Sequence, residues 1–158
     1  WRSNVSLDWH LLERTAYQTH HAFFQAANAL YLTESVLWSQ AFQWYPVFCG
    51  QQNLLSFLRQ ATSGSAILCL CNPTATPFSC GVLSLPGIGT CQILLSSDEK
   101  RFGGANTCSI LPCPVAPEQP GSQLQVYLPP RTCVLIRYIP ARRPDPLGSP
   151  PPDSLRSR

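Results

Sequence analysis

The chain is poor in charged residues, and lysine is almost missing from it. Charged residues make up 12% of the 158 residues, about half of the usual quarter, and Lys100 is the only lysine. The net charge of +3 comes from 11 basic and 8 acidic residues, and four of the arginines lie in the last 17 positions. No basic stripe is left that could neutralise nucleic-acid phosphates, so nucleic acid is not an expected partner. The normal apolar share of 44% excludes a highly charged disordered chain.

Long hydrophobic runs are also lacking. The longest purely apolar run, residues 66–71, is about a third of the roughly 20 residues that a membrane-spanning helix requires. A membrane is therefore not an expected partner. The sequence begins at Trp1, with neither an initiator Met nor a charged-then-apolar leader, which indicates a piece cut from a longer polypeptide.

Cysteine is abundant, and its even number is compatible with disulfides. Several of the cysteines nevertheless lie inside apolar runs, where a reduced cysteine acts as a small hydrophobic side chain. The spacing does not provide two C-x2-C pairs, so neither a structural zinc site nor any other cofactor is predicted. A secreted sandwich stapled by disulfides stays open as one hypothesis. The eight positions are Cys49, Cys69, Cys71, Cys80, Cys91, Cys108, Cys113 and Cys133.

Proline and glycine divide the chain into three parts. Residues 1–45 contain neither, residues 46–140 contain 11 prolines and 8 glycines, and residues 141–158 contain five prolines and one glycine. The third part has almost no apolar side chains, which predicts a disordered tail rich in proline and arginine. The alternative that its proline run docks into an aromatic groove stays open.

The first part predicts a helix over about residues 15–39. Apolar side chains recur at steps of three and four residues and form a wide aromatic face, which one helix cannot bury alone and which therefore needs a partner surface. A break is expected near residues 33–35, with Ser35 as a new N-cap. One stripe of this face is Ala16, His20, Phe23, Ala27 and Leu30, and the flanking stripe is Tyr17, Phe24 and Tyr31.

The second part predicts an antiparallel β-sandwich. Short apolar or alternating runs are separated by turn residues at spacings of eight to twelve residues. The run 67–71 is apolar on both faces and should be a central strand, whereas residues 78–85 alternate less cleanly. The predicted strands are residues 54–59, 65–71, 78–85, 90–95, 109–111, 123–128 and 132–139.

No catalytic residues are predicted. Asp98 and Glu99 are adjacent in a charged turn and are expected to be solvated, and His20 and His21 point about 100° apart on the helix. The Gly87–Gly89 region lacks the following helix and lysine of a phosphate-binding loop, and no serine lies in a nucleophile elbow. The carboxylates available to a glycosidase-like site are Asp8, Glu13, Glu34, Asp98, Glu99, Glu118, Asp145 and Asp153.

A series of short motifs resembles the bacterial 1,4-α-glucan (glycogen) branching enzymes of the α-amylase superfamily, in the family's order and over residues 1 to 139. The most specific motif is Ser6-Leu7-Asp8-Trp9-His10-Leu11-Leu12 at the end of the catalytic barrel, a few residues after a Glu-Trp pair whose Trp corresponds to Trp1. The later ones are Ala27-Asn28-Ala29-Leu30-Tyr31, Phe42-Gln43-Trp44 as a turn, residues 53–59, Leu70-Cys71-Asn72 with Thr74, Ser96-Ser97-Asp98 followed by Phe102-Gly103-Gly104, and Leu128-Pro129-Pro130 with Val134-Leu135.

The resemblance implies a retaining transglycosylase that makes α-1,6 branches in glycogen, with α-glucan as its substrate and the cytoplasm as its location. The family's catalytic carboxylates belong to barrel motifs that precede Trp1, so none is carried over, and Asp8 is not one of them. Residues 1–45 would be the end of the catalytic (β/α)8 barrel with its last helix, and residues 46–140 the C-terminal β-sandwich that supports this missing barrel. The family's helix is rich in Arg and Asp where this chain has Gln25, Ala26, Ala27 and Ala29, and the eight cysteines and the tail have no counterpart in the resemblance.

Exposed aromatic rings could also contact sugar, because the C–H faces of sugars stack on flat rings. Trp1 and Trp9 are the candidates closest to the expected mouth of the barrel, although packing against another surface is the competing interpretation. A non-catalytic carbohydrate-binding β-sandwich module is therefore the alternative function. The weaker candidates for a sugar contact are Trp38, Trp44 and Tyr127.

Overall fold

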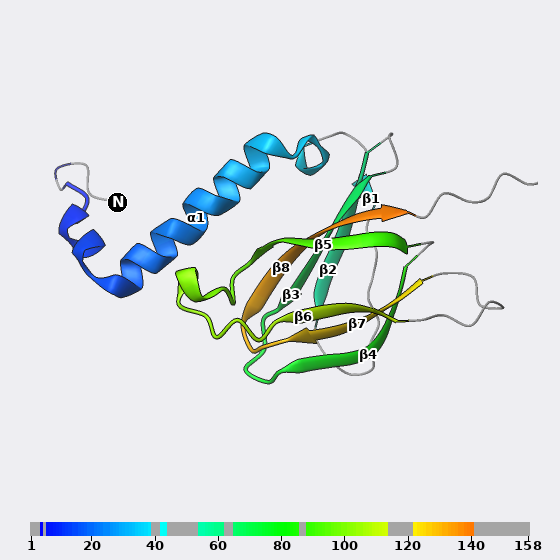
Figure 1. Ribbon diagram of the computed structural model, residues 1–158. Helices are drawn as coiled ribbons and strands as arrows, with labels where there is room; N and C mark the ends of the chain where they lie inside the picture. The colour runs from blue at the N-terminus through cyan, green and yellow to red at the C-terminus, as the bar shows by residue number, and fades with distance from the viewer. Residues whose placement is uncertain are drawn as a thin grey trace, which may run out of the picture.

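A helical segment followed by eight short strands forms the described part of the chain (Figure 1). The computed structural model describes residues 4, 6–38, 42–43, 54–61, 65–85, 88–113 and 122–140. The helical elements are the 3-10 helix η1 (Trp9–Glu13), the 19-residue helix α1 (Thr15–Thr33) and the 3-10 turns η2 (Ser35–Leu37) and η3 (Lys100–Phe102). The strands are β1 (Phe42–Gln43), β2 (Leu55–Gln60), β3 (Ala66–Asn72), β4 (Phe78–Leu85), β5 (Ile88–Ser96), β6 (Ser109–Cys113), β7 (Ser122–Leu128) and β8 (Thr132–Pro140).

The strands form two antiparallel sheets. The larger has the order β1-β2-β3-β8-β5 and the smaller the order β4-β7-β6, and every neighbouring pair is antiparallel. The mainly β fold, an antiparallel sandwich preceded by a helix, is thus confirmed, and β3 is the central strand of its sheet as its apolar run predicted. The weaker alternation of β4 coincides with a register shift between Cys80 and Leu83.

The main core lies between the two sheets. Alternate side chains of β3 and β8 point toward β7 and β4, as the period of two in a strand requires. Eleven residues of this core are each no more than 3% exposed, and burying a side chain of this size stabilises the fold by roughly 1.5–3 kcal/mol before losses of entropy. They are Leu58, Ala66, Leu68, Leu70, Phe78, Leu124, Val126, Leu128, Val134, Ile136 and Tyr138.

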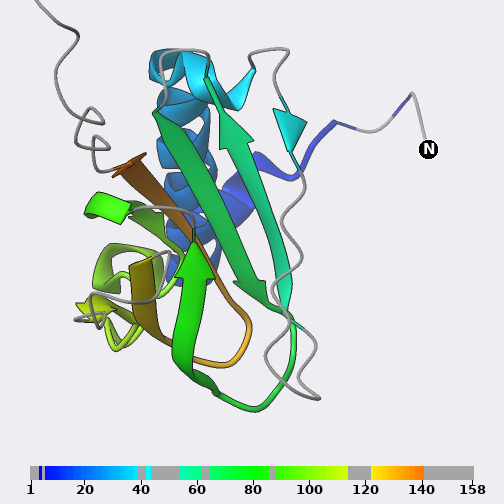
Figure 2. The same cartoon turned by 90° about the vertical axis from the view of Figure 1, so that its right-hand side faces the viewer.

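The helix α1 covers the outer face of the larger sheet. Figure 2 shows it behind β3 and β8, so that helix, larger sheet and smaller sheet form three layers. The turn η2, which contacts β2 and β3, lies on the same face, where Ile67 and Cys69 point away from the main core and are still only 1% and 7% exposed. No helix in the described ranges is long and apolar enough to cross a membrane.

Asn72 is a buried polar residue that ties the end of β3 to the turn between β7 and β8. Its Nδ2 lies 2.9, 3.3 and 3.0 Å from the carbonyl oxygens of Thr76, Leu128 and Pro129. Its Oδ1 accepts hydrogen bonds from the Thr74 backbone N–H and hydroxyl at 3.1 and 2.6 Å. These partners replace the water that Asn72, only 1% exposed, has lost.

Two local predictions at the end of α1 were wrong. Ser35 is not an N-cap, because it lies inside the single 3-10 turn η2, whose N-cap position is Glu34, and no side chain caps that turn. Phe42 and Gln43 are not a turn, because they pair with Arg59 and Leu58 of β2 as the edge strand β1. Trp44, the last residue of that motif, lies outside the described residues.

Candidate functional site

The two aromatic stripes of α1 have different surroundings. The stripe that contains Phe23 packs on the sandwich, where the Phe23 ring meets the Phe102 ring edge-on at 5.3 Å between centroids. Near the N-terminal end of α1, a Cβ at Gly103 would lie 3.7 Å from the Thr19 hydroxyl, an ordinary contact distance. The wide apolar face predicted for the helix is therefore only half covered by the sheet.

The C-terminal end of the helical segment is fastened to the same sheet. The carboxylate of Glu34 forms an ion pair with the guanidinium of Arg137 on β8. The Nε of Arg59 on β2 donates to the carbonyl oxygen of Val36, which is itself 7% exposed. These contacts position the rest of α1 and hold its other stripe away from the sandwich.

That other stripe is exposed. The side chains of Tyr17, Phe24 and Tyr31, spaced seven residues apart, are 45%, 52% and 51% exposed. Trp9 of η1 extends the same surface and is 65% exposed. If each side chain has about 200 Å² of surface, these four together expose roughly 400 Å² of aromatic surface. The largest apolar patch on a typical monomer has this size and is often functional.

Between η1 and α1 the exposed stripe forms a groove of about 380 Å³. Arg14, in an extended conformation, separates the two helical elements and lets η1 turn alongside the first turns of α1. His20 contributes through its ring, which meets the Phe24 ring edge-on at 4.8 Å. The groove's main lining residues are Trp9, Leu11, Leu12, Tyr17, His20 and Phe24.

The chemistry of this groove is that of a contact surface. Asp8 is the one carboxylate in its lining, whereas acid–base or nucleophilic cleavage of a glycosidic bond needs a pair. Among the described residues, no three His, Cys, Asp or Glu side chains form a group that could hold a metal ion. The groove can therefore take an apolar partner surface or a flat ring, and its described lining does not contain the pair of carboxylates that cleavage of a glycosidic bond needs.

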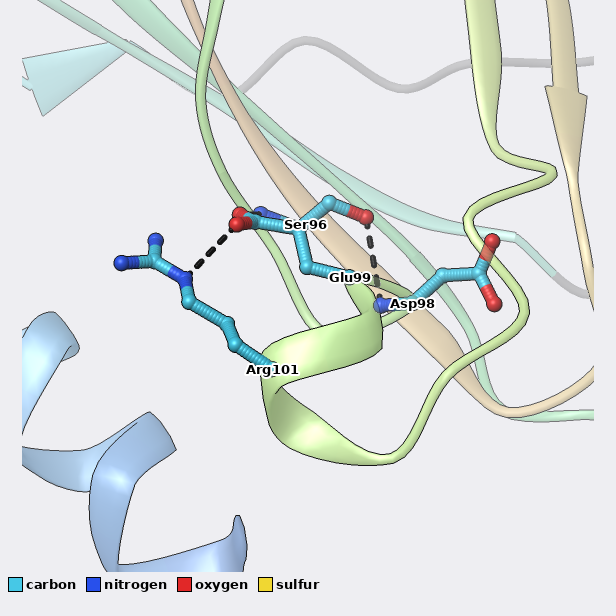
Figure 3. Close-up of polar contacts among 4 residues, drawn as sticks. All are labelled: Ser96, Asp98, Glu99 and Arg101. Atoms are coloured by element: carbon cyan, nitrogen blue, oxygen red, sulfur yellow. Dashed lines mark hydrogen bonds and ion pairs between the residues drawn. The ribbon is translucent and has the colours of Figure 1, made fainter.

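The loop after β5 is the second candidate feature, and it lies at the edge of the surface that α1 covers. The Glu99 carboxylate forms an ion pair with Arg101 at 2.8 Å, and the Asp98 backbone N–H donates to the Ser96 hydroxyl at 3.3 Å (Figure 3). The Asp98 carboxylate points to the other side, toward the returning strand of the loop.

Asp98 is not solvated, so that prediction was wrong. Asp98 is only 7% exposed. Its carboxylate accepts hydrogen bonds from the backbone N–H groups of Ala105, Thr107 and Cys108 at 2.9, 2.5 and 2.8 Å. Burial alone would raise the pKa of Asp98, but these three donors and the Thr107 hydroxyl outweigh burial and lower its pKa. The carboxylate therefore stays ionised and holds the loop closed.

Gly104 allows this closure. A Cβ at Gly104 would lie 2.2 Å from the backbone carbonyl carbon and oxygen of Asp98, closer than any side chain permits. The preceding Gly103 ends η3 with φ at +87°, in the left-handed region. The two glycines are thus needed for different reasons. Gly103 adopts a left-handed conformation, and Gly104 allows two backbone segments to approach closely.

The other predicted site residues are scattered. Trp1 and Trp44 lie outside the described residues, and Trp38, 55% exposed, follows η2 at the far end of α1 from Trp9. Tyr127 is half-buried on β7, in the smaller sheet. Of the sugar-contact candidates, only Trp9 is placed in a groove by the described structure, and its role stays a prediction.

Three thiols that are far apart in the sequence form a cluster on the larger sheet, which the sequence pattern did not predict. Cys69 and Cys133 lie with their Sγ atoms 3.7 Å apart, and Cys71 is opposite Cys133 in the β3–β8 register. The alternation of Cys69 and Cys71 on one face of a strand was visible in the sequence, but the register that brings Cys133 beside them was not. All five cysteines whose side chains are described are free thiols: Cys69, Cys71, Cys91, Cys108 and Cys133.

Comparison with known proteins places these features in a family context. Residues 49–139 match the model of the family described as alpha amylase, C-terminal all-beta domain. The chain is 30% identical over 142 residues to the 1,4-alpha-glucan branching enzyme GlgB of Chlamydia pneumoniae, covering 85% of this chain and 20% of that protein. It is 28% identical to the enzyme of the same name from Chlamydia caviae, with 87% and 20% covered. A third, from Nitrosomonas eutropha, is 32% identical over 111 residues, with 67% and 15% covered. The chain thus spans about a fifth of the length of the first two of these relatives.

Proposed function

Because the chain belongs to the family of the alpha-amylase C-terminal all-beta domain, we propose that it is the C-terminal portion of a 1,4-α-glucan branching enzyme. In this proposal residues 1–45 complete a catalytic barrel, residues 46–140 form the supporting sandwich and residues 141–158 are a tail. The reaction, transfer of an α-1,4-glucan segment to a 6-hydroxyl, would be performed by the barrel, and α-glucan would reach this chain only through the complete enzyme.

The single observation that carries the proposal is the half-covered helix. One stripe of α1 is packed on the sandwich through Phe23, while Tyr17 and Phe24 on the other stripe are 45% and 52% exposed. Burying the roughly 400 Å² of exposed aromatic surface at about 25 cal/mol per Å² would contribute roughly 10 kcal/mol before the costs of association. A partner that covers this stripe, such as the barrel, would stabilise the complete protein by whatever part of this contribution exceeds those costs.

A chimera tests the proposal. The corresponding C-terminal fifth of the Chlamydia pneumoniae enzyme is replaced by this chain, and branching is followed as the fall in the absorbance of the iodine–amylose complex. We expect the chimera to branch amylose and the isolated chain to leave the spectrum unchanged. The double variant Tyr17→Ser/Phe24→Ser of the chimera should lose at least tenfold in activity, because the helix no longer fills its interface.

The matched control is Gln18→Ser/Gln25→Ser, which changes two exposed polar residues one step along the same helix. This control should keep the activity of the unmodified chimera. Branching by the isolated chain would contradict the proposal, as would equal losses of activity in the two double variants.

The alternative, a carbohydrate-binding module, is favoured by one feature, the 65% exposure of Trp9 beside Tyr17 in the groove. Flat rings in a shallow groove can stack on sugar C–H faces. Under this alternative the isolated chain should be retarded in a native gel cast with glycogen, and Trp9→Ala should abolish the retardation. Unretarded migration of the unmodified chain would remove the alternative and leave the supporting role.

A further inference from the structure

Three thiols meet on the face of the larger sheet that α1 covers. Cys69 and Cys71 are two residues apart on β3, so their side chains lie on the same face. Cys133 on β8 pairs with Cys71 in the register, which places it on that face as well, and its Sγ lies 3.7 Å from the Sγ of Cys69. Cys69 is buried, whereas Cys71 and Cys133 are partly exposed.

The backbone geometry makes Cys71 and Cys133 the closer pair of chain positions. The backbone N–H of Cys133 donates to the Ser97 hydroxyl, and its carbonyl oxygen accepts from the Ser97 N–H, each at 2.9 Å. Both groups therefore point away from β3, so Cys71 and Cys133 form a non-hydrogen-bonded pair with Cα atoms about 4.5 Å apart. This separation lies within the range of about 4.4–6.8 Å that a disulfide allows.

Cys69 is placed differently. It is opposite Leu135, so it is a diagonal neighbour of Cys133, and such neighbours are about 7–8 Å apart. That separation is too long for a disulfide without movement of the backbone. The Sγ–Sγ contact at 3.7 Å instead suits a hydrogen bond between the thiol of Cys69 and the sulfur of Cys133.

The pKa values of the three thiols are shifted in different directions, with that of Cys133 lowered and those of Cys69 and Cys71 raised. Hydrogen bonding, first from the Cys69 thiol and then from Cys71, lowers the pKa of Cys133 to about 7 even though burial opposes it. The bond to Cys133 and burial raise the pKa of Cys69, and burial is the main reason that the pKa of Cys71 is raised. The lowered pKa of Cys133 favours its thiolate, the reactive form of cysteine, and the raised pKa values of its two neighbours favour their thiols.

We propose that Cys133 is a modification site, a peroxide-reactive thiol that closes a reversible disulfide with Cys71, and that Cys69 is a positioning residue that supplies a hydrogen bond to it. The Cys133 thiolate attacks the terminal oxygen of a hydroperoxide and the O–O bond breaks. Cys133 becomes a sulfenic acid, and the other oxygen leaves as an alkoxide or hydroxide that takes a proton from solvent to give an alcohol or water. The Cys71 sulfur then attacks the Cys133 sulfur, the S–O bond breaks, and water leaves with the Cys71 proton. The two thiols supply two electrons to the peroxide, and a dithiol reductant restores them.

Peptide mapping after peroxide treatment tests the site in the full chain. Trypsin cleaves after Arg131 and Arg137 and releases residues 132–137, a peptide with Cys133 as its only cysteine. After treatment with one equivalent of hydrogen peroxide and alkylation of the remaining thiols, we expect this peptide to be joined to residues 60–100, with fragmentation placing the link at Cys71. Cys91 in the same long peptide is the internal control, because burial raises its pKa and it should stay reduced.

Three variants separate the roles. Cys71→Ser should lose the link and leave a sulfenic acid on Cys133 that dimedone captures. Cys133→Ser should give neither the link nor the dimedone product. Cys69→Ala, which has no donor to offer and whose fold is checked by circular dichroism, should keep the Cys71 link but form it several-fold more slowly at pH 7, with the midpoint of the rate against pH moved upward.

The outcomes against the proposal are equally concrete. Recovery of residues 132–137 as the alkylated free thiol, or their linkage to any cysteine other than Cys71, would overturn it. An unchanged rate and pH midpoint in Cys69→Ala would overturn the positioning role of Cys69. None of these results depends on branching activity, so the proposal stands or falls apart from the function proposed above.

Discussion

Replacing Asp98 with asparagine tests whether the loop after β5 depends on one buried carboxylate. In Asp98→Asn the amide oxygen can still accept the N–H groups of Thr107 and Cys108, which lie 2.5 and 2.8 Å from one carboxylate oxygen, but the NH2 group then faces the Ala105 N–H. That buried donor loses its acceptor at a cost of about 1–3 kcal/mol, and the remaining hydrogen bonds lose the charge that strengthens them. After partial relaxation we expect a loss of about 3 kcal/mol in the free energy of unfolding, which lowers the Tm by roughly 10 °C.

The neighbouring residue provides the control. Glu99→Gln removes an exposed ion pair with Arg101, whose side chain is 59% exposed, and leaves an oxygen for the Ser96 N–H that Glu99 now accepts at 3.0 Å. Exposed pairs of this kind are worth about 0–1 kcal/mol, so the Tm should fall by a few degrees at most. Urea denaturation followed by circular dichroism at pH 7 measures both variants on one scale.

The same pair of variants carries a pH signature. Because the pKa of Asp98 is lowered in the folded protein, its ionised form stabilises the fold fully above the unfolded value of 3.8, and this stability is lost as the pH falls through the folded pKa. Asp98→Asn should therefore lose less stability than the unmodified chain between pH 4 and pH 2. Equal losses in Asp98→Asn and Glu99→Gln at pH 7 would refute the buried-acceptor argument.

Two further substitutions test close contacts in the loops. Gly104→Ala should destabilise the fold by about 1–3 kcal/mol, because its Cβ would overlap the Asp98 backbone. Gly103→Ala should destabilise it less, because only its left-handed φ is unfavourable. Thermal unfolding of the two variants measures the difference, and the reverse order would contradict the argument. Asn72→Ala should lower the free energy of unfolding by about 2–4 kcal/mol in urea denaturation, because the buried backbone groups around Asn72 lose their partner. The control Asn28→Ala, on the exposed surface of α1, should be neutral or slightly stabilising. Similar values for the two variants would show that the buried hydrogen bonds contribute little.

The strands were largely predictable because their signals are local. Alternating apolar residues and turn residues such as Asn72-Pro73 marked the strands β2 to β8 to within a few residues, and the doubly apolar run of β3 indicated a central position. The two-residue strand β1 was not predictable, because its pairing with β2 depends on contacts across the fold rather than on a pattern in Phe42 and Gln43. Ser35 looked like a cap, but the ion pair of Glu34 with Arg137 lies where the chain leaves the helix.

The sites that were predicted wrongly or missed have one feature in common. Their contacts are made with residues that are distant in the sequence or that a turn brings back into contact. The donors to Asp98 come from residues 7 to 10 positions later, after the Gly-Gly turn folds the chain back. The aromatic stripes of α1 were visible as one wide face, but which half the sandwich covers depends on where Phe102 lies. Cys133 is 64 residues from Cys69, and only the register of β3 and β8 brings their sulfur atoms together.

The attachment of α1 near both ends has a mechanical consequence. Thr19 lies beside Gly103 and Glu34 is paired with Arg137, so the helix and the larger sheet should rotate as one rigid body. A 19-residue helix is roughly 28 Å long, and a rotation of about 5° around one end moves the other by about 2.5 Å. Tilting of the sandwich would thus be transmitted, as a displacement of ångström scale, to whatever surface rests on Tyr17 and Phe24.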